Sequence, residues 1–246
     1  MLMMDDARSV SSDPMQELEQ RLTRTWEELF ASSRFIQAVQ RGEITKALYA
    51  IYMIETYHYT YHNARNQAVV ATRGQEMNRH YQKFCLMHAA EEVGHEQMAL
   101  HDVLSLGLKA GDVQLPNPLP ETETLIAYLY WVSANGNPIR RIGYSYWAES
   151  CYRYINPLIQ KVREALRLTP AQLTFFVAHA EIDQDHMATV NEMLQKVCKT
   201  EQDWREVGDV METSLRLTGR MMDAVYEEYL ALRDKRSARY AFLERL

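Results

Sequence analysis

Apolar residues recur along most of this chain with the spacing of three and four positions that is typical of amphipathic helices. The first such pattern begins at Pro14, with Asp13 as a suitable N-cap, and its apolar positions are Leu18, Leu22, Trp26 and Phe30. Similar patterns predict further helices over residues 34–40, 45–72, 76–106, 121–135, 138–166, 169–199 and 200–234. Thr45 is the predicted cap of the 45–72 helix, and Thr200 is predicted to open the last one.

Glycine and proline mark the ends of these segments. Gly42, Gly74 and Gly107 each follow a predicted helix, and residues 111–123, which include three prolines, form the only substantial predicted loop. Pro157 is expected to kink the long helix that contains it. No alternating pattern of the kind found in strands is flanked by turn signals. We therefore predict an all-α bundle of seven or eight helices.

Composition and charge narrow the class of protein. Of 246 residues, 47% are hydrophobic, so we expect one domain over residues 13–246, preceded by a flexible tail of residues 1–12. With 27 basic and 33 acidic residues the net charge is −6, and no basic stripe indicates nucleic-acid binding. The sequence has no run of 18 apolar residues and no secretory signal. We therefore expect a cytoplasmic protein that does not bind membranes.

Two stretches share a pattern that is typical of metal ligands in helical bundles. Each places two histidines and a carboxylate at offsets of three, four and seven, which return to one stripe of a helix. The two trios are His88, Glu92 and His95, and His179, Asp183 and His186. Imidazole and carboxylate ligands without a thiolate suit iron or manganese better than a structural zinc.

Two further glutamates complete the set that a carboxylate-bridged pair of metals requires. Such sites take one Glu from each of two helices and a Glu-x-x-His from each of two others. Glu55 and Glu149 lie in aromatic, apolar segments, where a buried carboxylate needs a metal or a cation. The alternative interpretation places these two carboxylates in buried salt bridges and the acidic residues of the trios on solvated helix faces. The candidate cations are Arg65, Arg140, Arg141 and Arg153.

These residues and spacings make the chain similar to a known family. Its terminal His-x3-Asp-x2-His, the Glu149 that precedes it, the Glu91–His95 stretch and the helix end at Leu106–Gly107 resemble the heme-oxygenase-like di-iron oxidases and oxygenases. That family shares its fold with thiaminase-II-type and pyrroloquinoline-quinone-synthase-type proteins. The resemblance covers nearly the whole chain and implies a heme-oxygenase-like helical bundle.

The resemblance also implies a ligand set for two irons. One iron would take His95 with carboxylates from Glu55 and Glu92, and Glu149 would bridge or be shared between the two irons. The other iron would take His179, Asp183 and His186. Members of the family differ in the earlier ligands, so Glu91 is an alternative to Glu92.

Other residues near these positions are candidates for supporting roles. His58 and His62 follow Glu55 on the same helix face and are suited to hydrogen-bond a ligand carboxylate. His88 is expected to contact substrate or to be an ordinary buried histidine rather than a ligand. Arg140 and Arg141 are candidates to hold a substrate carboxylate, and Tyr146 is one of several tyrosines on the predicted site helices.

The activity implied by the resemblance is oxidation of a small molecule by O2. The cofactor would be two irons that cycle between Fe(II) and Fe(III), with O2 as co-substrate and an external reductant. The substrate would be an amine, amino acid or fatty acid, and the reaction N-oxygenation or oxidative C–C cleavage in specialised metabolism. A manganese–iron pair stays open, as does the oligomeric state, with a homodimer as one option.

Two rival functions remain. Cys85, Cys151 and Cys198 form no close-spaced motif and are expected to be core thiols. Cys151, just past Glu149, could nevertheless be the nucleophile of a metal-free hydrolase of the thiaminase-II type. A ferritin-like iron-binding protein would keep the metal without oxidising an organic substrate. Heme oxygenase activity is disfavoured, because residues 14–31 contain no histidine to ligate heme.

Overall fold

The computed structural model describes residues 13–73 and 77–246, and of residues 178–185 it describes only the backbone. The predicted tail of residues 1–12 and the predicted helix end at Gly74 lie outside this description. The described part is helical and contains no strand, so the all-α fold is confirmed. Its α-helices are α1 (Pro14–Ser32), α2 (Arg34–Gln40), α3 (Lys46–Ala71), α4 (Arg79–Glu91), α5 (Glu96–Ser105), α6 (Pro120–Ala134), α7 (Ile142–Ser150), α8 (Tyr152–Leu166), α9 (Thr174–Val197) and α10 (Glu201–Arg233).

The helix starts follow the predicted caps. The side chain of Asp13 accepts a hydrogen bond from the Met15 N–H at the start of α1. Thr45 and Thr200 cap α3 and α10 in the same way. Four short 3₁₀ helices, Ala110–Asp112, Pro138–Arg141, Pro170–Gln172 and Ala241–Leu243, lie between or after the longer elements.

The described residues form ten α-helices, where seven or eight were expected, because two predicted helices are divided. The first division follows Glu91, and there Gly94 adopts a φ of +99°, a conformation that favours glycine. The second lies at Cys151, whose N–H bonds to the carbonyl of Ala148 with a length of 3.3 Å. Pro157 lies inside α8, so the interruption falls on the N-terminal side of the proline instead of at the proline.

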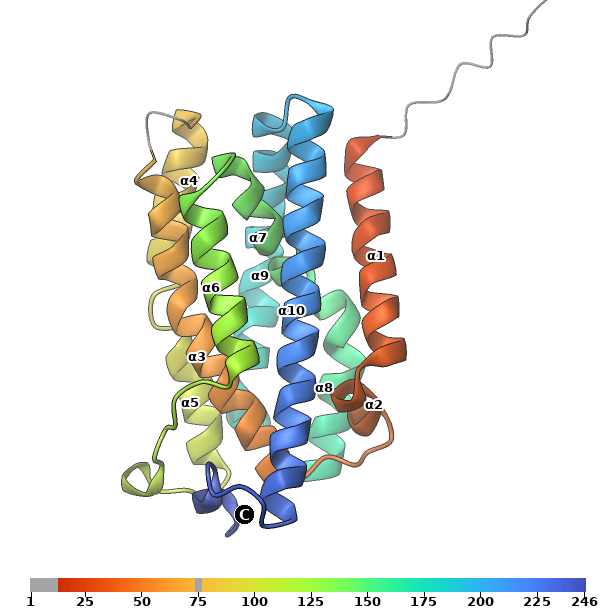
Figure 1. Ribbon diagram of the computed structural model, residues 1–246, viewed down its shortest axis with the longest axis vertical. Coiled ribbons are helices and arrows are strands. Elements are labelled where there is room, and N and C mark those ends of the chain that lie inside the picture. Colours follow the sequence, from red (N-terminus) through yellow and green to blue (C-terminus); the bar gives the residue numbers. More distant parts are fainter. Residues whose placement is uncertain (1–12, 74–76) are drawn as a thin grey trace, which may run out of the picture.

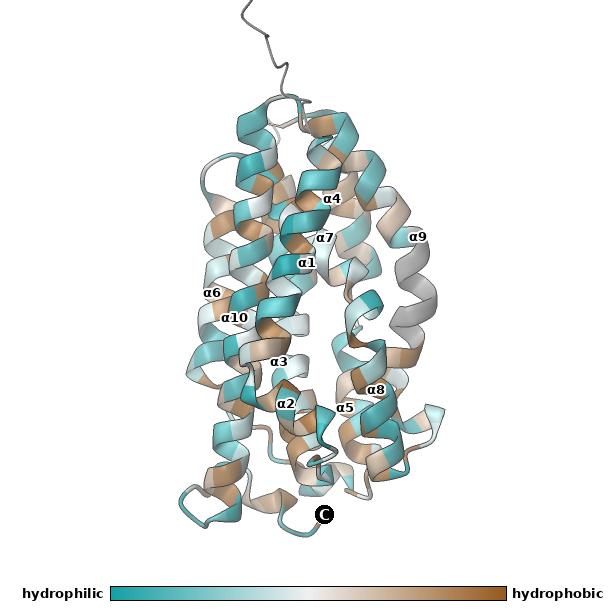
Figure 2. Ribbon diagram, turned by 90° about the vertical axis from the view of Figure 1, so that its right-hand side faces the viewer, coloured by the Kyte–Doolittle hydropathy of each residue, from teal (hydrophilic) through white to brown (hydrophobic). Residues whose placement is uncertain are grey.

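The helices pack around α3 and α10. In Figure 1, α1, α3, α6 and α10 run roughly along the long axis, and α2 and α8 lie together near one end. Helix α3 packs against α4, α5 and α6, while α10 packs against α1, α6 and α7. Much of the ribbon of α1 is hydrophilic (Figure 2). Its buried side chains, among them Leu22 and Trp26, belong to the hydrophobic core. None of the described helices combines the length and apolar character needed to cross a membrane.

A glycine allows α7 to approach α10 closely. A Cβ atom built on Gly143 would lie 2.1 Å from the carbonyl oxygen of Val207 and 2.9 Å from the backbone nitrogen of Met211. Only hydrogen fits at this position. The contact fixes α7 against the backbone of α10, and α7 carries Glu149.

Candidate metal centre

Four side chains from three separate parts of the sequence meet between α4, α7 and α9. They are His88 near the end of α4, Glu92 just after it, Glu149 on α7 and His186 on α9. One ligand atom from each residue lies within 4.8 Å of the others. The side chains of His88, Glu92 and Glu149 are buried, and that of His186 is 15% exposed. Buried carboxylates and imidazoles in this proximity form a group that is capable of holding a metal ion.

Glu149 lies between two imidazoles. Nε2 of His88 donates to Oε1 at 3.1 Å, and Nδ1 of His186 lies 3.4 Å from Oε2. Burial alone would raise the pKa of Glu149, but hydrogen bonding and the charges of these two histidines outweigh it and lower the pKa to about 2. The facing carboxylate correspondingly raises the pKa of His186 to about 9. Both oxygens of Glu149 are therefore directed at candidate metal ligands.

Glu92 is held by an amide and a buried arginine. Asn63 on α3 donates to Glu92 Oε2 at 2.7 Å, and Arg141 Nη2 donates to the side-chain oxygen of Asn63 at 2.9 Å. Arg141 is fully buried, and its Nε donates to Asn66 at 2.8 Å. The other carboxylate oxygen of Glu92 lies 3.5 Å from Nδ1 of His95. The amide and guanidinium therefore fix the orientation of Glu92, much as outer hydrogen bonds fix metal ligands.

The described side chains fit a metal ion. Nδ1 of His88 is buried and has no hydrogen-bond partner among the described residues, which is unusual for a buried polar atom. Two imidazoles and two carboxylates without a thiolate are ligands that iron and manganese accept. His95 lies beside the cluster, with its Nδ1 3.5 Å from Oε1 of Glu92. The side chains of His179 and Asp183, the other predicted ligands, lie outside the described residues, although their backbone belongs to α9.

The first predicted trio gathers near this centre for a different reason from the one expected. His88, Glu92 and His95 do not share the stripe of one helix, because α4 ends at Glu91 and α5 begins at Glu96. The intervening turn brings the imidazole of His95 back towards Glu92. His88, expected to be a substrate contact or an ordinary buried residue, is a member of the four-residue cluster.

The structure does not bring Glu55 to the cluster. Its carboxylate accepts hydrogen bonds from the Leu119 N–H at 2.9 Å, from the Tyr240 hydroxyl at 2.5 Å and from the hydroxyl of Thr122. Asn63, which contacts Glu92, is eight residues further along α3, so Glu55 lies about 12 Å away along the helix axis. Glu55 therefore joins α3 to the start of α6 and to the C-terminal segment.

The two histidines expected to support Glu55 have other surroundings. His58 stays in the neighbourhood of Glu55 and the Pro116 backbone, and its burial lowers its pKa. His62 Nδ1 lies 3.0 Å from the hydroxyl of Tyr130 on α6. Neither is a member of the four-residue cluster.

Of the remaining candidates, Glu91 borders the centre, whereas Arg140 and Tyr146 have other partners. Glu91 Oε2 lies 3.5 Å from Nε2 of His186, so this half-exposed carboxylate borders the centre. The guanidinium of Arg140 stacks over the ring of Trp131 at 4.7 Å. Tyr146 donates to Glu19 on α1 at 2.6 Å, so its hydroxyl is directed away from the centre. Asn63 was missed by the sequence analysis, because it stands among other polar residues of α3, from His62 to Gln67, and has no distinguishing signal.

The cluster separates two cavities. An inner cavity of about 80 Å³ reaches Glu92 and Glu149 and is otherwise lined mainly by aromatic residues, among them Tyr59, Tyr144, Trp147 and Phe175. An outer groove of about 500 Å³ reaches His88 and His186, with Lys83 and Lys196 along it. The carboxylates therefore border an aromatic space, and the imidazoles border a groove that carries two lysines.

The cysteines are free thiols. Cys85 and Cys198 are buried, and burial raises the pKa of each to about 12, which agrees with the predicted core role. Cys151 is only partly buried and lines the inner cavity beside Glu149.

Comparisons with known proteins agree with this centre. A family model described as iron-containing redox enzyme matches residues 50–219. A domain of unknown function with a heme oxygenase-like fold from Shewanella denitrificans OS217 is 51% identical, with a TM-score of 0.88 over 93% of this chain and 98% of that one. No functionally curated protein matches the chain.

More distant structures share the fold alone. A TenA homologue from P. horikoshii OT3 is 12% identical, with a TM-score of 0.69 over 87% of this chain and 98% of its own. Heme oxygenase-1 from the cyanobacterium Synechocystis, solved with heme, is also 12% identical, with a TM-score of 0.64 over 90% of this chain and 96% of its own. The predicted heme-oxygenase-like bundle is thereby confirmed.

Proposed function

The chain belongs to the family of iron-containing redox enzymes, and we propose that it is a non-heme di-iron oxidoreductase that uses O2 to oxidise a small organic substrate. The observation that carries the proposal is the buried cluster of His88, Glu92, Glu149 and His186. When bound there, iron would supply electrons to O2, and an external reductant would restore Fe(II).

The protein's own part in this reaction is positioning and exclusion of water. Glu149, which lies between two imidazoles, would act as a metal ligand together with them. Asn63 and Arg141 hold Glu92 in one orientation. His95, and His179 and Asp183 of α9, whose side chains lie outside the described residues, remain the further ligands that the sequence predicts. The aromatic inner cavity would hold the substrate next to the carboxylate side of the centre and keep bulk water out.

Heme is a poorer fit to the same fold. Helix α1 contains no histidine that could ligate a heme iron. The inner cavity of about 80 Å³ is also too small for a macrocycle, since a cavity of about 150 Å³ holds only a benzene-sized molecule. The iron of this protein is therefore proposed to be bound by side chains.

A hydrolase is the second candidate, and one observation favours it. Cys151 lines the inner cavity beside Glu149, where a nucleophile would meet a bound substrate. Replacement of Cys151 by Ala separates the two functions. A hydrolase would lose its activity, whereas the oxidoreductase would keep iron binding and O2 consumption.

The test is O2 consumption by iron-loaded protein. Metal-free protein is loaded with Fe(II) without oxygen, examined by Mössbauer spectroscopy and mixed with O2 in the presence of amines, amino acids or fatty acids. We expect two irons per chain and an oxidised product whose yield depends on O2. Glu149→Gln should lose both, and Glu164→Gln, which changes an exposed carboxylate of α8, should lose neither.

Two results would contradict the proposal in different ways. Iron oxidation without any organic product, across all substrate classes, would indicate an iron-storage protein. Absence of stoichiometric iron, together with hydrolysis that depends on Cys151, would indicate the hydrolase.

A further inference from the structure

Two aromatic rings of α7 lie beside the carboxylates of the metal centre. Tyr144 and Trp147 line the inner cavity together with Glu92 and Glu149, and their ring centroids lie 5.3 Å apart at an interplanar angle of 82°. The guanidinium of Arg141 lies 4.5 Å from the centroid of the Tyr144 ring. This positive charge disfavours the loss of an electron from Tyr144, so Trp147 is the more easily oxidised of the two rings.

Ring contacts continue from Trp147 across α1 to α8. The ring centroid of Trp147 lies 6.3 Å from that of Trp26 on α1, with the two ring planes at 73°. Trp26 in turn stacks on Tyr154 of α8, with the centroids 5.3 Å apart and the planes at 14°. Trp26 is 1% exposed, whereas Tyr154 is only partly buried. Because electrons transfer readily between aromatic rings in contact, these residues form a path between the inner cavity and the surface.

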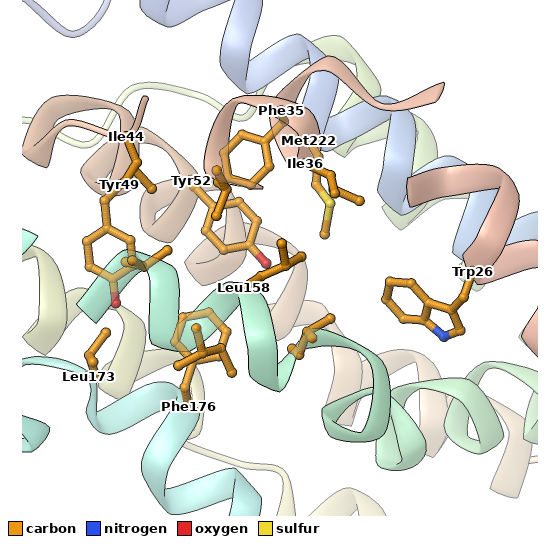
Figure 3. A pocket seen from close by; sticks show the side chains of 14 residues that line it. Trp26, Phe35, Ile36, Ile44, Tyr49, Tyr52, Leu158, Leu173, Phe176 and Met222 are labelled. Carbon is orange, nitrogen blue, oxygen red and sulfur yellow. The ribbon is translucent and has the colours of Figure 1, made fainter. Parts of the chain in front are cut away.

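Trp26 offers no route for the proton of its indole. Its Nε1 atom is buried and has no hydrogen-bond partner among the described residues. The ring lies at one side of an apolar cavity of about 50 Å³, and among the described residues that line this cavity none has a carboxylate or an imidazole (Figure 3). An oxidised Trp26 would therefore stay a cation in apolar surroundings, which is unfavourable. The electron vacancy would move on to the next ring.

Tyr154, by contrast, has a carboxylate within reach of its hydroxyl. The hydroxyl donates to Oε1 of Glu19 at 3.4 Å and lies 3.1 Å from the hydroxyl of Thr23. Burial would raise the pKa of Glu19, but hydrogen bonds from Tyr146 and Arg153 outweigh it and lower the pKa, so Glu19 is ionised near neutral pH. A tyrosine that loses an electron becomes a strong acid, and Glu19 is placed to take its proton.

We propose that these rings let an oxidising equivalent leave the metal centre when no substrate is bound. This inference rests on the proposed function, because the oxidant is iron that has reacted with O2. Tyr154 gives up one electron, which passes through Trp26 and Trp147 to the oxidised iron, and the phenol proton passes to the Glu19 carboxylate. The products are a neutral tyrosyl radical and iron reduced by one electron. A soluble reductant such as ascorbate then returns an electron to Tyr154, and the proton returns from Glu19.

The path protects the residues around the centre. Without it, the oxidising equivalent would attack side chains that line the inner cavity, among them Tyr144 and Cys151. With it, the radical moves to Tyr154, which is partly exposed and within reach of a soluble reductant.

The experiment follows the radical by electron paramagnetic resonance. Full-length protein is loaded anaerobically with Fe(II), mixed with O2 without an organic substrate, and frozen at successive times. We expect a tyrosyl signal, identified by its narrowing when the tyrosine rings carry deuterium, and its loss in Tyr154→Phe. Tyr226→Phe, which changes a partly exposed tyrosine of α10 outside the path, should keep the signal. A signal of wild-type size in Tyr154→Phe would overturn the inference.

Trp26→Phe tests the middle of the path. It keeps an aromatic ring but removes the readily oxidised indole, so the tyrosyl signal should be lost and mass spectrometry should find added oxygen at Tyr144 or Cys151. Trp131→Phe, which changes an exposed tryptophan of α6, should match wild type. A tyrosyl signal at Tyr154 that persists in folded Trp26→Phe would overturn the inference. Should Trp26→Phe fail to fold, Tyr154→Phe, which removes only a hydroxyl, decides the question.

Glu19→Gln tests the proton acceptor. Without the carboxylate, the yield of the tyrosyl radical should fall while iron content stays unchanged. Glu27→Gln, which changes an exposed carboxylate of the same helix, should leave the yield as in wild type. An unchanged yield in Glu19→Gln would overturn the transfer of the proton to Glu19.

Iron content and O2 uptake, measured in the same samples, separate this inference from the proposed function. Iron that is bound and oxidised by O2 in wild type, without a tyrosyl signal or an oxidised Tyr154, contradicts the path alone. Absence of iron binding or of O2 uptake contradicts the proposed function, and the path with it, because no oxidant then reaches Trp147.

Discussion

Helices α7 and α8 follow each other almost without a break, yet they are buried to opposite extents. Eight of the nine residues of α7 are buried, and none of the residues of α8 is. Helix α7 packs against α9 and α10, and its Trp147 donates to Ser214 on α10 at 2.8 Å. Helix α8 packs mainly against α2, and its Ile155, Leu158, Ile159 and Val162 line an apolar cavity of about 50 Å³.

The difference in burial between α7 and α8 matches the position of Glu149, which lies on α7. A carboxylate that orients two imidazoles has to be held still, and α7 is held by packing on all sides. The apolar face of α8 borders a cavity and is only partly buried. Substitutions in α7 should therefore cost more folding stability and metal binding than substitutions in α8.

The largest expected difference in stability is between isoleucine-to-alanine substitutions in α7 and in α8. Ile142→Ala removes a fully buried side chain of α7 and should lower the free energy of unfolding by about 2–5 kcal/mol. Ile159→Ala removes a partly exposed side chain that already borders a cavity, and should cost less than about 2 kcal/mol. Urea denaturation of both variants measures the difference. Equal losses would contradict the comparison.

A smaller loss is expected where α7 touches the backbone of α10. Gly143→Ala places a Cβ atom against the Val207 carbonyl and should cost about 1–3 kcal/mol, because one of the two helices has to move. Gly111→Ala is the control, since nothing lies within 4 Å of its added Cβ, and it should change stability by less than about 0.5 kcal/mol. Thermal unfolding that ranks these variants in the reverse order would show that the approach of α7 to α10 is not needed.

The hydrogen bonds that join Glu92 to Asn63 and Asn63 to Arg141 predict an effect on metal affinity. Asn63→Leu removes the amide between Glu92 and Arg141 and should weaken metal binding about 10–100-fold, the usual cost of losing a hydrogen bond to a ligand. Competition against a metal-sensitive dye measures the affinity. Gln202→Ala, an exposed change on α10, serves as the control. Unchanged affinity in Asn63→Leu would remove Glu92 from the ligand set.

The smallest effect is a pH dependence of metal-free protein. The pKa of His186 rises to about 9, so its stabilising contribution is complete below pH 6.5 and is lost as pH rises through about 9. The pKa of Glu149 falls to about 2, so its contribution is complete above pH 4.5 and is lost as pH falls through about 2. The pair therefore stabilises the fold most between pH 4.5 and 6.5.

Glu149→Gln tests this pH dependence. Its deficit in unfolding free energy relative to wild type should be largest between pH 4.5 and 6.5 and shrink towards pH 9. Glu164→Gln on the exposed face of α8 should show no such profile. A deficit for Glu149→Gln that stays constant across this range would contradict the ion pair with His186.

Local sequence signals were sufficient for the helix starts but not for the helix breaks. Asp13, Thr45 and Thr200 cap the helices that they were predicted to cap, because their side chains act on neighbouring N–H groups. The break at Cys151 has no such local signal. It reflects packing, since α7 is surrounded by α9 and α10, whereas α8 turns towards α2.

The candidate centre was predictable to a similar degree. The structure brings Glu92, Glu149 and His186 together, but Glu92 reaches the cluster from the turn after α4 and not through the shared helix stripe that the spacing predicted. Burial alone could not identify the partner of Glu55, because one of its donors, Tyr240, is 185 residues away. His88 was assigned a lesser role, since nothing in one sequence distinguishes a ligand from an ordinary buried histidine.

The most direct test of the metal centre is an anaerobic Fe(II) titration of wild type, Glu149→Gln and Glu55→Gln, with folding checked by circular dichroism. Both variants change a buried glutamate to the amide, but only Glu149 lies in the cluster. We predict that Glu149→Gln loses iron and that Glu55→Gln retains it. Loss of iron in Glu55→Gln with retention in Glu149→Gln would contradict the centre described here.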